Sequence, residues 1–406
     1  MLPYGQGRSY GDSCLNDGNL LIDVNALDRF MQFDQHSGIL RCEAGVTLDE
    51  ILAFAVPRRW FLPVTPGTKH VTVGGAVAND VHGKNHHKAS TFGCHVTQFE
   101  IARSTGERLL CSPNENVEFF NATIGGLGLT GLILWAEIQL KRISTAQIDR
   151  ESIRFGNLDE FFDIAASSDR DFEYTVAWID CLANGRQLGR GIFLRGNHRE
   201  AEGDAGAKIS RKQRKSFTVP CSAPDVLLNR LTMKAFNLAY YLSHYSRYRK
   251  GVVDYEPFFY PLDALRHWNR LYGSRGFLQY QCVVPCQDKG EAIKDILSRI
   301  AISKKASFLS VLKLFGSRPS PGMLSFPRPG VTLALDFAYD GDKTCNLLDE
   351  LDGIVRTVGG AVYPAKDARM TAASFQAFFP KWKEFGAFVD PKFSSSLWRR
   401  VTGGRR

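Results

Sequence analysis

The stretch from 63 to 92 constrains the fold of this chain most, because it gathers glycine, hydroxyl, amide and imidazole side chains in one short unit. It reads PVTPGTKHVTVGGAVANDVHGKNHHKASTF and holds four histidines, at positions 70, 82, 86 and 87. A plain core segment has no use for this mixture. A loop that brings its backbone close to a large polyanionic ligand does, since glycines permit close approach. The stretch therefore predicts a ligand-binding loop.

Two further glycine-rich runs flank this stretch. Residues 4–12, YGQGRSYGD, offer N–H groups that can converge into a nest for phosphate, with a simple turn as the alternative. Residues 124–133, IGGLGLTGLI, predict an apolar surface that excludes water and lies against a flat or large ligand. The alternative is a bulge at the start of a strand. Thr72 is expected to open a short helix whose free N–H groups suit a pyrophosphate.

Composition narrows the class of ligand. The 406 residues carry a net charge of +9 that is spread along the chain, which favours anionic small molecules or an anionic membrane surface over nucleic acid. The nine cysteines are widely spaced and form no CxxC pair, and the histidines lack regularly spaced partners. We therefore expect no metal site.

Localisation signals are few. No run of about 18 apolar residues occurs, and the N-terminus, MLPYGQGRSYGD, lacks the basic-then-apolar order of a secretory signal. We expect a protein that is cytoplasmic or peripheral at the membrane. Residues 240–250, YYLSHYSRYRK, interleave tyrosines with cations, which suits a membrane–water interface. A surface helix whose tyrosines pack into the core is an alternative of equal weight to the membrane–water interface.

The pattern of elements predicts an α+β fold whose character changes after about residue 144. Thr47 and Glu50 form a capping box that opens a helix, and a hairpin is expected over 98–110. One helix is expected from Met370 to Phe388. Strand-like segments that predict an antiparallel sheet with helices on one face recur at 174–180, 191–196, 277–284, 307–314 and 331–338.

Seven blocks follow one another in the order of one known family: PYGQGRSYGD, VTPGTKHVTVGGAVANDVHGKNHH, IGGLGLTG, FYPLD, GFLQYQ, LKLFG and YPAKDAR. Over essentially the whole chain they resemble the decaprenylphosphoryl-β-D-ribose oxidase family of vanillyl-alcohol-oxidase-type (PCMH-type) flavoproteins. The resemblance implies a two-domain fold. An FAD-binding domain would span 1–143, an antiparallel-sheet substrate domain would span 144–359, and residues 360–406 would return to the FAD domain.

The resemblance also implies noncovalent FAD, because the first glycine loop carries Arg8, Ser9 and Tyr10 where related oxidases place a histidine that tethers the flavin. The residues that match the family's cofactor contacts are Gly5, Gln6, Gly7, Arg8, Ser9, Tyr10, Gly11, Asp12, Ser13, Gly67, Thr72, Val73, Gly74, Gly75, Asn79, Asp80, Val81, His82, Ile133 and Tyr363.

The family's active site matches a set of polar residues from both halves of the chain. Oxidising a secondary alcohol needs hydride loss to the flavin and proton loss to a base, and a cation beside the ring steadies the charge that the flavin gains. Lys366 is the candidate cation, although a solvated position remains the alternative for it and for Lys313. The matching residues are Tyr10, His82, Lys84, Tyr260, Arg270, Gln279, Gln281, Lys313 and Lys366.

The activity that the resemblance implies is FAD-dependent oxidation of the 2-hydroxyl of a polyprenyl-phosphate-linked ribose to the 2-keto sugar. This would be the first half of an epimerisation to arabinose, completed by a short-chain dehydrogenase/reductase partner. The alternatives are a sugar-lactone or alditol oxidase that uses oxygen, and a non-catalytic remnant that binds a sugar or lipid phosphate.

Two departures from the family stand out. The family has a further strand–helix–strand before its first glycine loop, so this chain is expected to be short at the N-terminus and weaker on the adenine side. Ala334 occupies the position where well-known members carry the cysteine that nitroaromatic inhibitors trap, so turnover is expected without covalent trapping.

Overall fold

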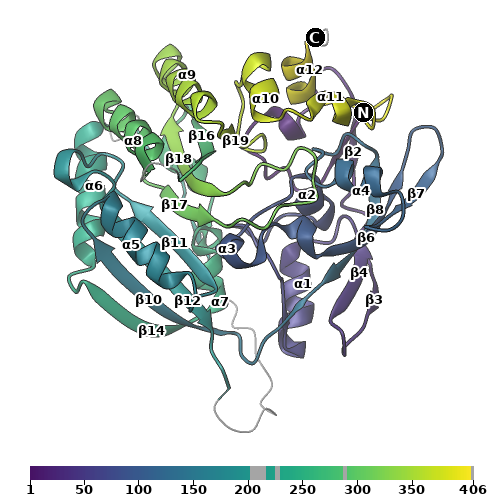
Figure 1. Ribbon diagram of the computed structural model, residues 1–406, viewed down its shortest axis with the longest axis horizontal. Coiled ribbons are helices and arrows are strands. Elements are labelled where there is room, and N and C mark those ends of the chain that lie inside the picture. Colours follow the sequence, from purple (N-terminus) through teal and green to yellow (C-terminus); the bar gives the residue numbers. More distant parts are fainter. Residues whose placement is uncertain (202–215, 225–228, 287–289, 404–406) are drawn as a thin grey trace.

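Two antiparallel sheets stand side by side in the computed structural model, which describes residues 1–201, 216–224, 229–286 and 290–403 (Figure 1). The smaller sheet has five strands and belongs to the first third of the chain. The larger sheet has eight strands and takes most of the rest. The presence of two antiparallel sheets together with helices confirms the predicted α+β class. The domain boundaries at 143 and 359 stay a prediction.

The smaller sheet has the strand order β3-β4-β8-β6-β7, and the expected hairpin is its β6–β7 pair. The capping box is confirmed at the start of α1, where the Thr47 hydroxyl accepts from the Glu50 N–H and the Glu50 carboxylate accepts from the Thr47 N–H. The elements of this part are β3 Phe30–Phe33, β4 Ile39–Glu43, α1 Leu48–Ala55, α2 Val73–Ala78, α3 His86–Ala89, β6 Val96–Ala102, β7 Arg108–Cys111, α4 Val117–Thr123 and β8 Leu132–Gln139.

The larger sheet has the order β14-β10-β12-β11-β17-β18-β16-β19, with every neighbouring pair antiparallel. All five strand-like segments predicted in this region are confirmed as strands. The bounds are β10 Gln147–Phe155, β11 Tyr174–Ile179, β12 Gly191–His198, β14 Tyr248–Asp254, β16 Phe277–Val284, β17 Ser310–Phe315, β18 Gly330–Ala338 and β19 Ala361–Val362.

Strands β10 and β14 did not stand out in the sequence because nearly half of their residues are charged. Glu151 on β10 is buried opposite Arg195 on β12, and the two side chains form an ion pair of 2.8 Å. Such a pair lets a strand bury a charge without an alternating apolar pattern. Tyr248, Arg249 and Lys250 lie at the start of β14, so the interleaved tyrosines and cations are split between a helix and a strand.

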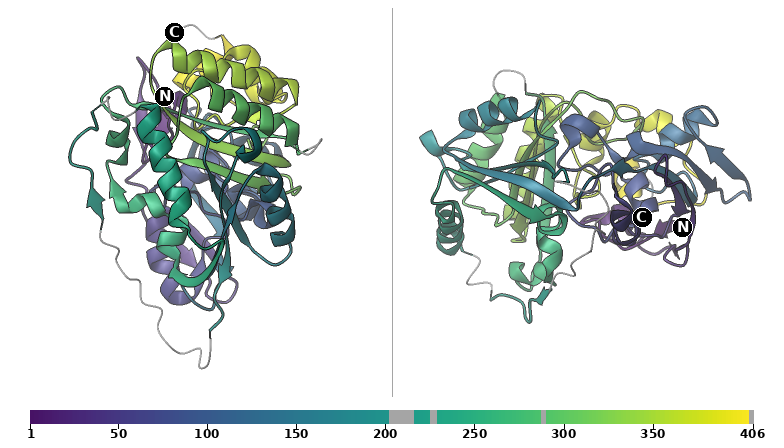
Figure 2. Two further views of the ribbon diagram at one scale, coloured as in Figure 1. Left: turned by 90° about the vertical axis from the view of Figure 1, so that its left-hand side faces the viewer. Right: turned by 90° about the horizontal axis from the view of Figure 1, so that it is seen from below.

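Helices α5 Leu158–Ser168, α8 Glu291–Ser303 and α9 Asp342–Thr357 bury apolar residues against the larger sheet, and the views of Figures 1 and 2 show them as one layer. Helix α6 Arg230–Ser243 leaves many of its large apolar side chains exposed, Leu231 and Leu242 among them. A short helix, α7 Tyr255–Phe259, leads from β14 back toward the smaller sheet. Among the described helices, none combines the length and the apolar character needed to cross a bilayer.

The last helices lie close to the start of the chain (Figure 1). Ser394 donates its N–H to the Met1 carbonyl, and strand β1 Leu2–Tyr4 pairs in parallel with β2 Leu21–Asp23. Instead of one helix over 370–388, the structure has α10 Ala372–Phe378 and α11 Trp382–Gly386, followed by α12 Ser396–Thr402. Pro380 lies in the gap, where it lacks the N–H that a continuous helix requires. The remaining short strands are β5 Trp60–Phe61, β9 Lys141–Arg142, β13 Phe217–Thr218 and β15 Leu265–Arg266.

Candidate active site

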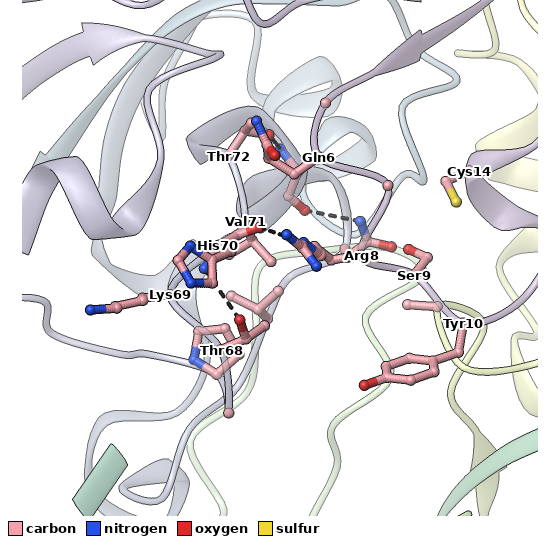
Figure 3. A pocket seen from close by; sticks show the side chains of 18 of the residues that line it. Gln6, Arg8, Ser9, Tyr10, Cys14, Thr68, Lys69, His70, Val71 and Thr72 are labelled. Atoms are coloured by element: carbon pink, nitrogen blue, oxygen red, sulfur yellow. Dashed lines mark hydrogen bonds between the residues drawn. The ribbon is translucent and has the colours of Figure 1, made fainter. Parts of the chain in front are cut away.

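A cavity of about 860 Å³ is lined by both halves of the molecule. One wall comes from the loops before β2 and around α2, and the other comes from β16, β17, β18 and the segment after β19. Figure 3 shows residues 6–10 of the first loop facing residues 68–72 of the second. This volume is near the upper end for ligand sites in proteins, so the cavity suits a large ligand.

The first wall is built mainly from backbone. Among the described residues, no group accepts from the N–H of Gln6, Gly7 or Arg8, and Gly7 has a positive φ of 56°. Three consecutive free amides around a left-handed residue form an anion nest. Opposite them, the Thr72 hydroxyl caps α2 by accepting from the Gly75 N–H, and the Arg8 guanidinium donates to the His70 carbonyl at 3.2 Å. The two loops are thereby held across a space that an anionic group can enter.

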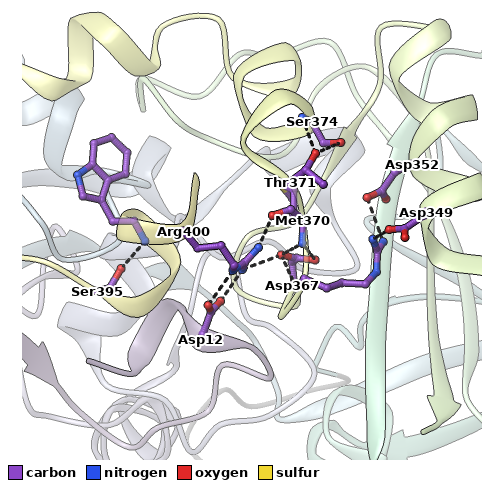
Figure 4. Close-up of polar contacts among 11 residues, drawn as sticks. Asp12, Asp349, Asp352, Asp367, Met370, Thr371, Ser374, Ser395 and Arg400 are labelled. Atoms are coloured by element: carbon purple, nitrogen blue, oxygen red, sulfur yellow. Dashed lines mark hydrogen bonds and ion pairs between the residues drawn. The ribbon is translucent and has the colours of Figure 1, made fainter. Parts of the chain in front are cut away.

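The C-terminal segment holds the first glycine loop in place. A Cβ on Gly11 would lie 1.5 Å from the Asp367 carbonyl oxygen, so only glycine allows the loop to lie against that segment. Arg400 donates to both carboxylate oxygens of Asp12 and to Asp367, and it also reaches the Met370 carbonyl (Figure 4). This bidentate ion pair links the loop, the last helix and the turn that carries Lys366.

The second wall is built from side chains on the larger sheet, with His82 reaching them from the loop after α2. The Gln281 Nε2 donates to the His82 Nε2 at 2.9 Å and to the Thr332 hydroxyl at 3.2 Å. The Lys313 Nζ lies 3.2 Å from the His82 Nδ1. Gln281, Lys313 and Thr332 come from three adjacent strands, so the sheet register brings them together.

The hydrogen bonds of Thr332 determine where the protons of this network lie. Its hydroxyl donates to the Cys282 carbonyl at 2.8 Å, so toward Gln281 it can only accept. The amide nitrogen of Gln281 therefore donates to His82, whose Nε2 must be unprotonated. The proton of neutral His82 then lies on Nδ1, and Lys313 receives it with a neutral amine.

Burial and neighbouring charges agree with this arrangement. Burial, reinforced by the charges of Lys84 and Lys366, lowers the pKa of Lys313 to about 7. Burial and then the charge of Lys313 hold the pKa of His82 well below its ordinary value, so the imidazole is neutral. The His82–Lys313 pair can therefore gain or lose a proton near neutral pH.

Lys366 stands on the same side of the cavity. Its Nζ lies 4.2 Å from the centre of the Tyr10 ring, which is a cation–π contact. Burial lowers the pKa of Lys366 to about 8, and the carboxylate of Asp336 opposes that shift. At the cavity wall, the Tyr260 hydroxyl lies 2.6 Å from the Thr65 hydroxyl, and this contact joins the two halves. A cation of tunable charge is thus placed at the wall between the loop and the sheet.

Most of the predicted site residues line the cavity. Of the proposed catalytic set, the residues found in its walls are Tyr10, His82, Tyr260, Gln279, Gln281, Lys313 and Lys366. Of the proposed cofactor contacts, those found there are Gly5, Gln6, Gly7, Arg8, Ser9, Tyr10, Ser13, Gly67, Thr72, Gly74, Gly75, Asn79, Val81, His82, Ile133 and Tyr363.

Six predicted residues lie outside the lining and support it instead. Gly11 and Asp12 contact the C-terminal segment as described, and Val73 is core. Asp80 is fully buried, where it accepts from the Gly93 N–H and from the hydroxyls of Ser320 and Ser325.

The other two are cations that a sequence match alone could not place. Lys84 donates to the Phe259 carbonyl at 3.3 Å, and burial lowers its pKa to about 8. Arg270 donates to the carbonyls of Val219 and Pro220 at 2.8 and 2.9 Å, so it fastens the backbone beside β13 rather than facing the cavity. Arg270 is therefore not brought to the cavity lining, and its membership of the catalytic set stays a prediction.

A cluster of ion pairs around Lys69, here called the ionic clasp, lies at the edge of the cavity and was not predicted from the sequence. The Lys69 Nζ pairs with Glu256 at 2.7 Å and with Asp49 at 3.1 Å, and the Lys69 N–H donates to Asp263 at 3.0 Å. Glu256 and Asp263 belong to the second half of the chain, so the clasp holds the two halves together. The signal was present in the FYPLD block, whose aspartate is Asp263, but its partner was visible only in three dimensions.

The comparisons with known proteins agree with this geometry. Residues 1–112 match the model of a family described as FAD binding domain. The decaprenylphosphoryl-β-D-ribose oxidase of Mycolicibacterium smegmatis is 38% identical over 98% of this chain and 88% of the relative. An uncharacterized protein in the mprA 5' region of Streptomyces coelicolor is 33% identical over 88% of this chain and all of the relative. Human delta(24)-sterol reductase is 30% identical over 29% of this chain and 23% of the relative.

These observations define the chain as an FAD-dependent oxidoreductase with a PCMH-type flavoprotein fold. Its residues fit the cofactor: free amides form an anion nest in the first glycine loop, and a helix N-terminus faces it in a cavity of sufficient size. Within that class, the chain belongs to the decaprenylphosphoryl-β-D-ribose oxidase family.

Proposed function

We propose that this enzyme oxidises the 2-hydroxyl of a ribose carried on a polyprenyl phosphate and gives the 2-keto sugar. The observation that carries the proposal is the side-chain wall of His82, Gln281, Lys313 and Lys366 opposite glycine loops suited to FAD. The 38% identity to an oxidase named for decaprenylphosphoryl ribose, over 98% of the chain, supports the substrate class.

The chain supplies positioning and charge for this reaction. The glycine loops and Tyr363 would hold FAD, which would supply the acceptor for the hydride of the carbon that bears the hydroxyl, with negative charge developing at that acceptor. The Lys366 ammonium stabilises that developing charge, and Tyr10 keeps the ammonium in place through its ring. The hydroxyl proton passes to the His82–Lys313 pair, whose pKa near neutrality suits a general base. Gln281 orients the imidazole of that pair.

The cationic character of the site also suits the anionic end of the substrate. Lys313 and Lys366 line the cavity, while Lys84 lies behind it and carries a charge that lowers the pKa of Lys313. The three carboxylates of the cavity lining, Asp49, Glu256 and Asp263, all bond to Lys69. A phosphate that enters beside Lys366 is expected to keep its amine protonated and to be held by it, which leaves the His82–Lys313 pair free to accept a proton.

The test is the absorbance spectrum of the purified holoenzyme before and after a polyprenyl-phosphoribose is added. We expect the yellow oxidised flavin to bleach in the absence of oxygen, and we expect a 2-keto product by mass spectrometry. Polyprenyl phosphate without the sugar is the matched control and should leave the spectrum unreduced. A flavin that stays oxidised with the ribose substrate, and is instead reduced by soluble sugar lactones or alditols with peroxide release in air, would contradict the proposal.

One partner enzyme follows from the proposed reaction. A 2-keto sugar is consumed by a reductase, so we propose a short-chain dehydrogenase/reductase that delivers hydride to the opposite face and completes the epimerisation. Coupled assays should then give the arabinose epimer only when both proteins and a nicotinamide cofactor are present. Recovery of ribose alone would exclude an epimerising partner of this kind.

A lipid-linked substrate also requires access from a membrane surface. We propose that α6 and the start of β14 contact an anionic bilayer, because Leu242 and Tyr245 are exposed, the Arg249 guanidinium lies over the Tyr245 ring, and Leu231 is exposed at the other end of α6. Wild-type protein should sediment with phosphatidylglycerol vesicles in low salt, and L242S together with Y245S should not. Equal sedimentation of both proteins would contradict this surface.

A further inference from the structure

Asp336 is a fully buried carboxylate that lies behind the side-chain wall. The proposed reaction assigns no role to it. It lies on β18 directly opposite Gln279 on β16, and the Gln279 Nε2 donates to its Oδ1 at 2.5 Å. The Tyr272 hydroxyl donates to its Oδ2 at 3.3 Å, and its backbone N–H donates to the Ser307 hydroxyl at 3.0 Å. Both carboxylate oxygens are therefore held from separate elements.

Gln279 lines the cavity, and its amide oxygen is buried without a donor among the described residues. An ionised carboxylate can only accept hydrogen bonds, so Asp336 dictates which end of the Gln279 amide faces it. One N–H of the amide is used by Asp336, and the Gln279 side chain also lies in hydrogen-bond reach of the Tyr10 hydroxyl as a donor, so the end of the amide left for a ligand is the oxygen. A buried acceptor without a donor is costly, so it is suited to a donor that arrives with the substrate.

We propose that Asp336 is a positioning residue for the oxidation: it fixes the Gln279 amide so that its oxygen accepts a hydrogen bond from a hydroxyl of the bound sugar. The inference rests on the proposed function and identifies a specificity element for it. A site built to accept from a hydroxyl rejects a sugar that lacks that hydroxyl, because the acceptor then stays unpaired.

The charges around Asp336 give the proposal an electrostatic consequence. The titratable groups that face it are Tyr272, Tyr10 and Lys366. Burial raises the pKa of Asp336 to about 6, while its hydrogen bond from Gln279 and the charge of Lys366 lower it. The carboxylate in turn raises the pKa of Lys366. Asp336 is thus ionised at neutral pH and favours the protonated form of Lys366.

The first test compares wild-type holoenzyme with Asp336→Asn, which keeps the size and removes the charge. The asparagine amide can donate to Gln279, so the glutamine is free to turn its nitrogen toward the cavity. We expect KM for the polyprenyl-phosphoribose to rise about tenfold. The alkaline limb of kcat should move to lower pH, since Lys366 loses a stabilising negative charge. Unchanged KM and an unchanged alkaline limb would overturn the proposal.

A double-mutant cycle asks whether Asp336 acts through Gln279. On a Gln279→Leu background, Asp336→Asn should add little to the loss in KM, because the acceptor is already gone. Fully additive losses would overturn the link. The matched control is Asp352→Asn, which removes another buried carboxylate whose pKa is raised to about 6 but which pairs with Arg369 away from the cavity. It should lower thermal stability without moving the alkaline limb.

A substrate-free measurement separates this inference from the proposed function. The infrared band of the protonated carboxyl that disappears in Asp336→Asn should titrate near pH 6 in the FAD-bound wild type. In Gln279→Leu the same band should titrate at higher pH, because the hydrogen bond that favours the carboxylate is gone. An unshifted band would overturn the Asp336–Gln279 link even if the enzyme oxidises ribose. A wild type that never reacts with ribose would instead contradict the proposed function alone.

Discussion

The two walls of the cavity are made in different ways. The glycine-loop wall presents backbone amides and close-fitting glycines, whereas the sheet wall presents amines, an imidazole and amides from side chains. The difference matches the two tasks. A diphosphate and a large ring are bound by a surface shaped by the backbone, whereas a reaction needs groups whose charge and proton can change. The first wall should be sensitive to added atoms, and the second should be sensitive to removed ones.

The largest expected effect is on the sheet wall. Lys366→Met removes the only cation placed over the Tyr10 ring among the described residues and should lower kcat by about 10²–10³-fold, the usual loss when a group that stabilises transition-state charge is deleted. FAD should stay bound, because the glycine loops are intact. Anaerobic flavin reduction in a stopped-flow instrument measures this, with exposed Lys383→Met as the control. An equal loss of kcat in both variants, or release of FAD from Lys366→Met, would contradict the separate roles of the two walls.

The next effect is on the glycine-loop wall. Gly11→Val places side-chain atoms where the Asp367 carbonyl lies 1.5 Å away, so the loop must move and FAD should be lost on gel filtration. Gly353→Ala in α9 meets nothing within 4 Å and is the matched control, with stability unchanged or raised by about 0.5–1 kcal/mol. Removing atoms from the same loop with Gln6→Ala should leave FAD bound. Retention of FAD by Gly11→Val would show that the loop tolerates added bulk.

The pH dependence of kcat sharpens the description of the sheet wall. Lys366, with a pKa of about 8, is cationic below that pH and loses its charge above it, so kcat should fall as pH rises past 8. The His82–Lys313 pair must be unprotonated to accept a proton, so kcat should rise as pH increases through about 7. Saturating-substrate kinetics from pH 5 to 10 should give a narrow maximum between these values. Lys366→Arg should keep some activity and lose the alkaline limb, and a limb that survives in it would assign the titration to another group.

The smallest expected effect concerns a cation that lies near the cavity without facing it. Arg270→Gln removes hydrogen bonds to the Val219 and Pro220 carbonyls, so it should lower stability by about 1–2 kcal/mol through loosened backbone near β13. Turnover should change less than about threefold, because no group that contacts the reacting atoms is removed. Thermal unfolding and steady-state kinetics on the same preparation check both. A loss as large as that of Lys366→Met would instead support the predicted place of Arg270 in the catalytic set.

Sequence reasoning succeeded where a local pattern carries the cause. The Thr47–Glu50 capping box and the apolar strands at 277–284 and 331–338 were predictable because their determinants lie within a few residues of each other. It failed at Met370–Phe388, where Pro380 divides the helix, and at β10, where an ion pair across strands replaces apolar alternation. The resemblance to a flavoprotein family then supplied the site residues that no local pattern identifies.

The sequence by itself determined the glycine loops, the class of fold and the residue types that the chemistry needs, because each depends on backbone freedom or on a short repeat of polarity. Only the tertiary structure decided which of those residues meet. Lys313 and His82 are 231 positions apart, and Gln279 and Asp336 are 57 apart, yet strand pairing and loop packing bring them within hydrogen-bond distance. The same packing turned Arg270 away from the cavity, since its nearest acceptors are the carbonyls of a neighbouring segment. Proton positions and pKa values depend on that packing, because burial and the distance to other charges set the free energy of each ionised group.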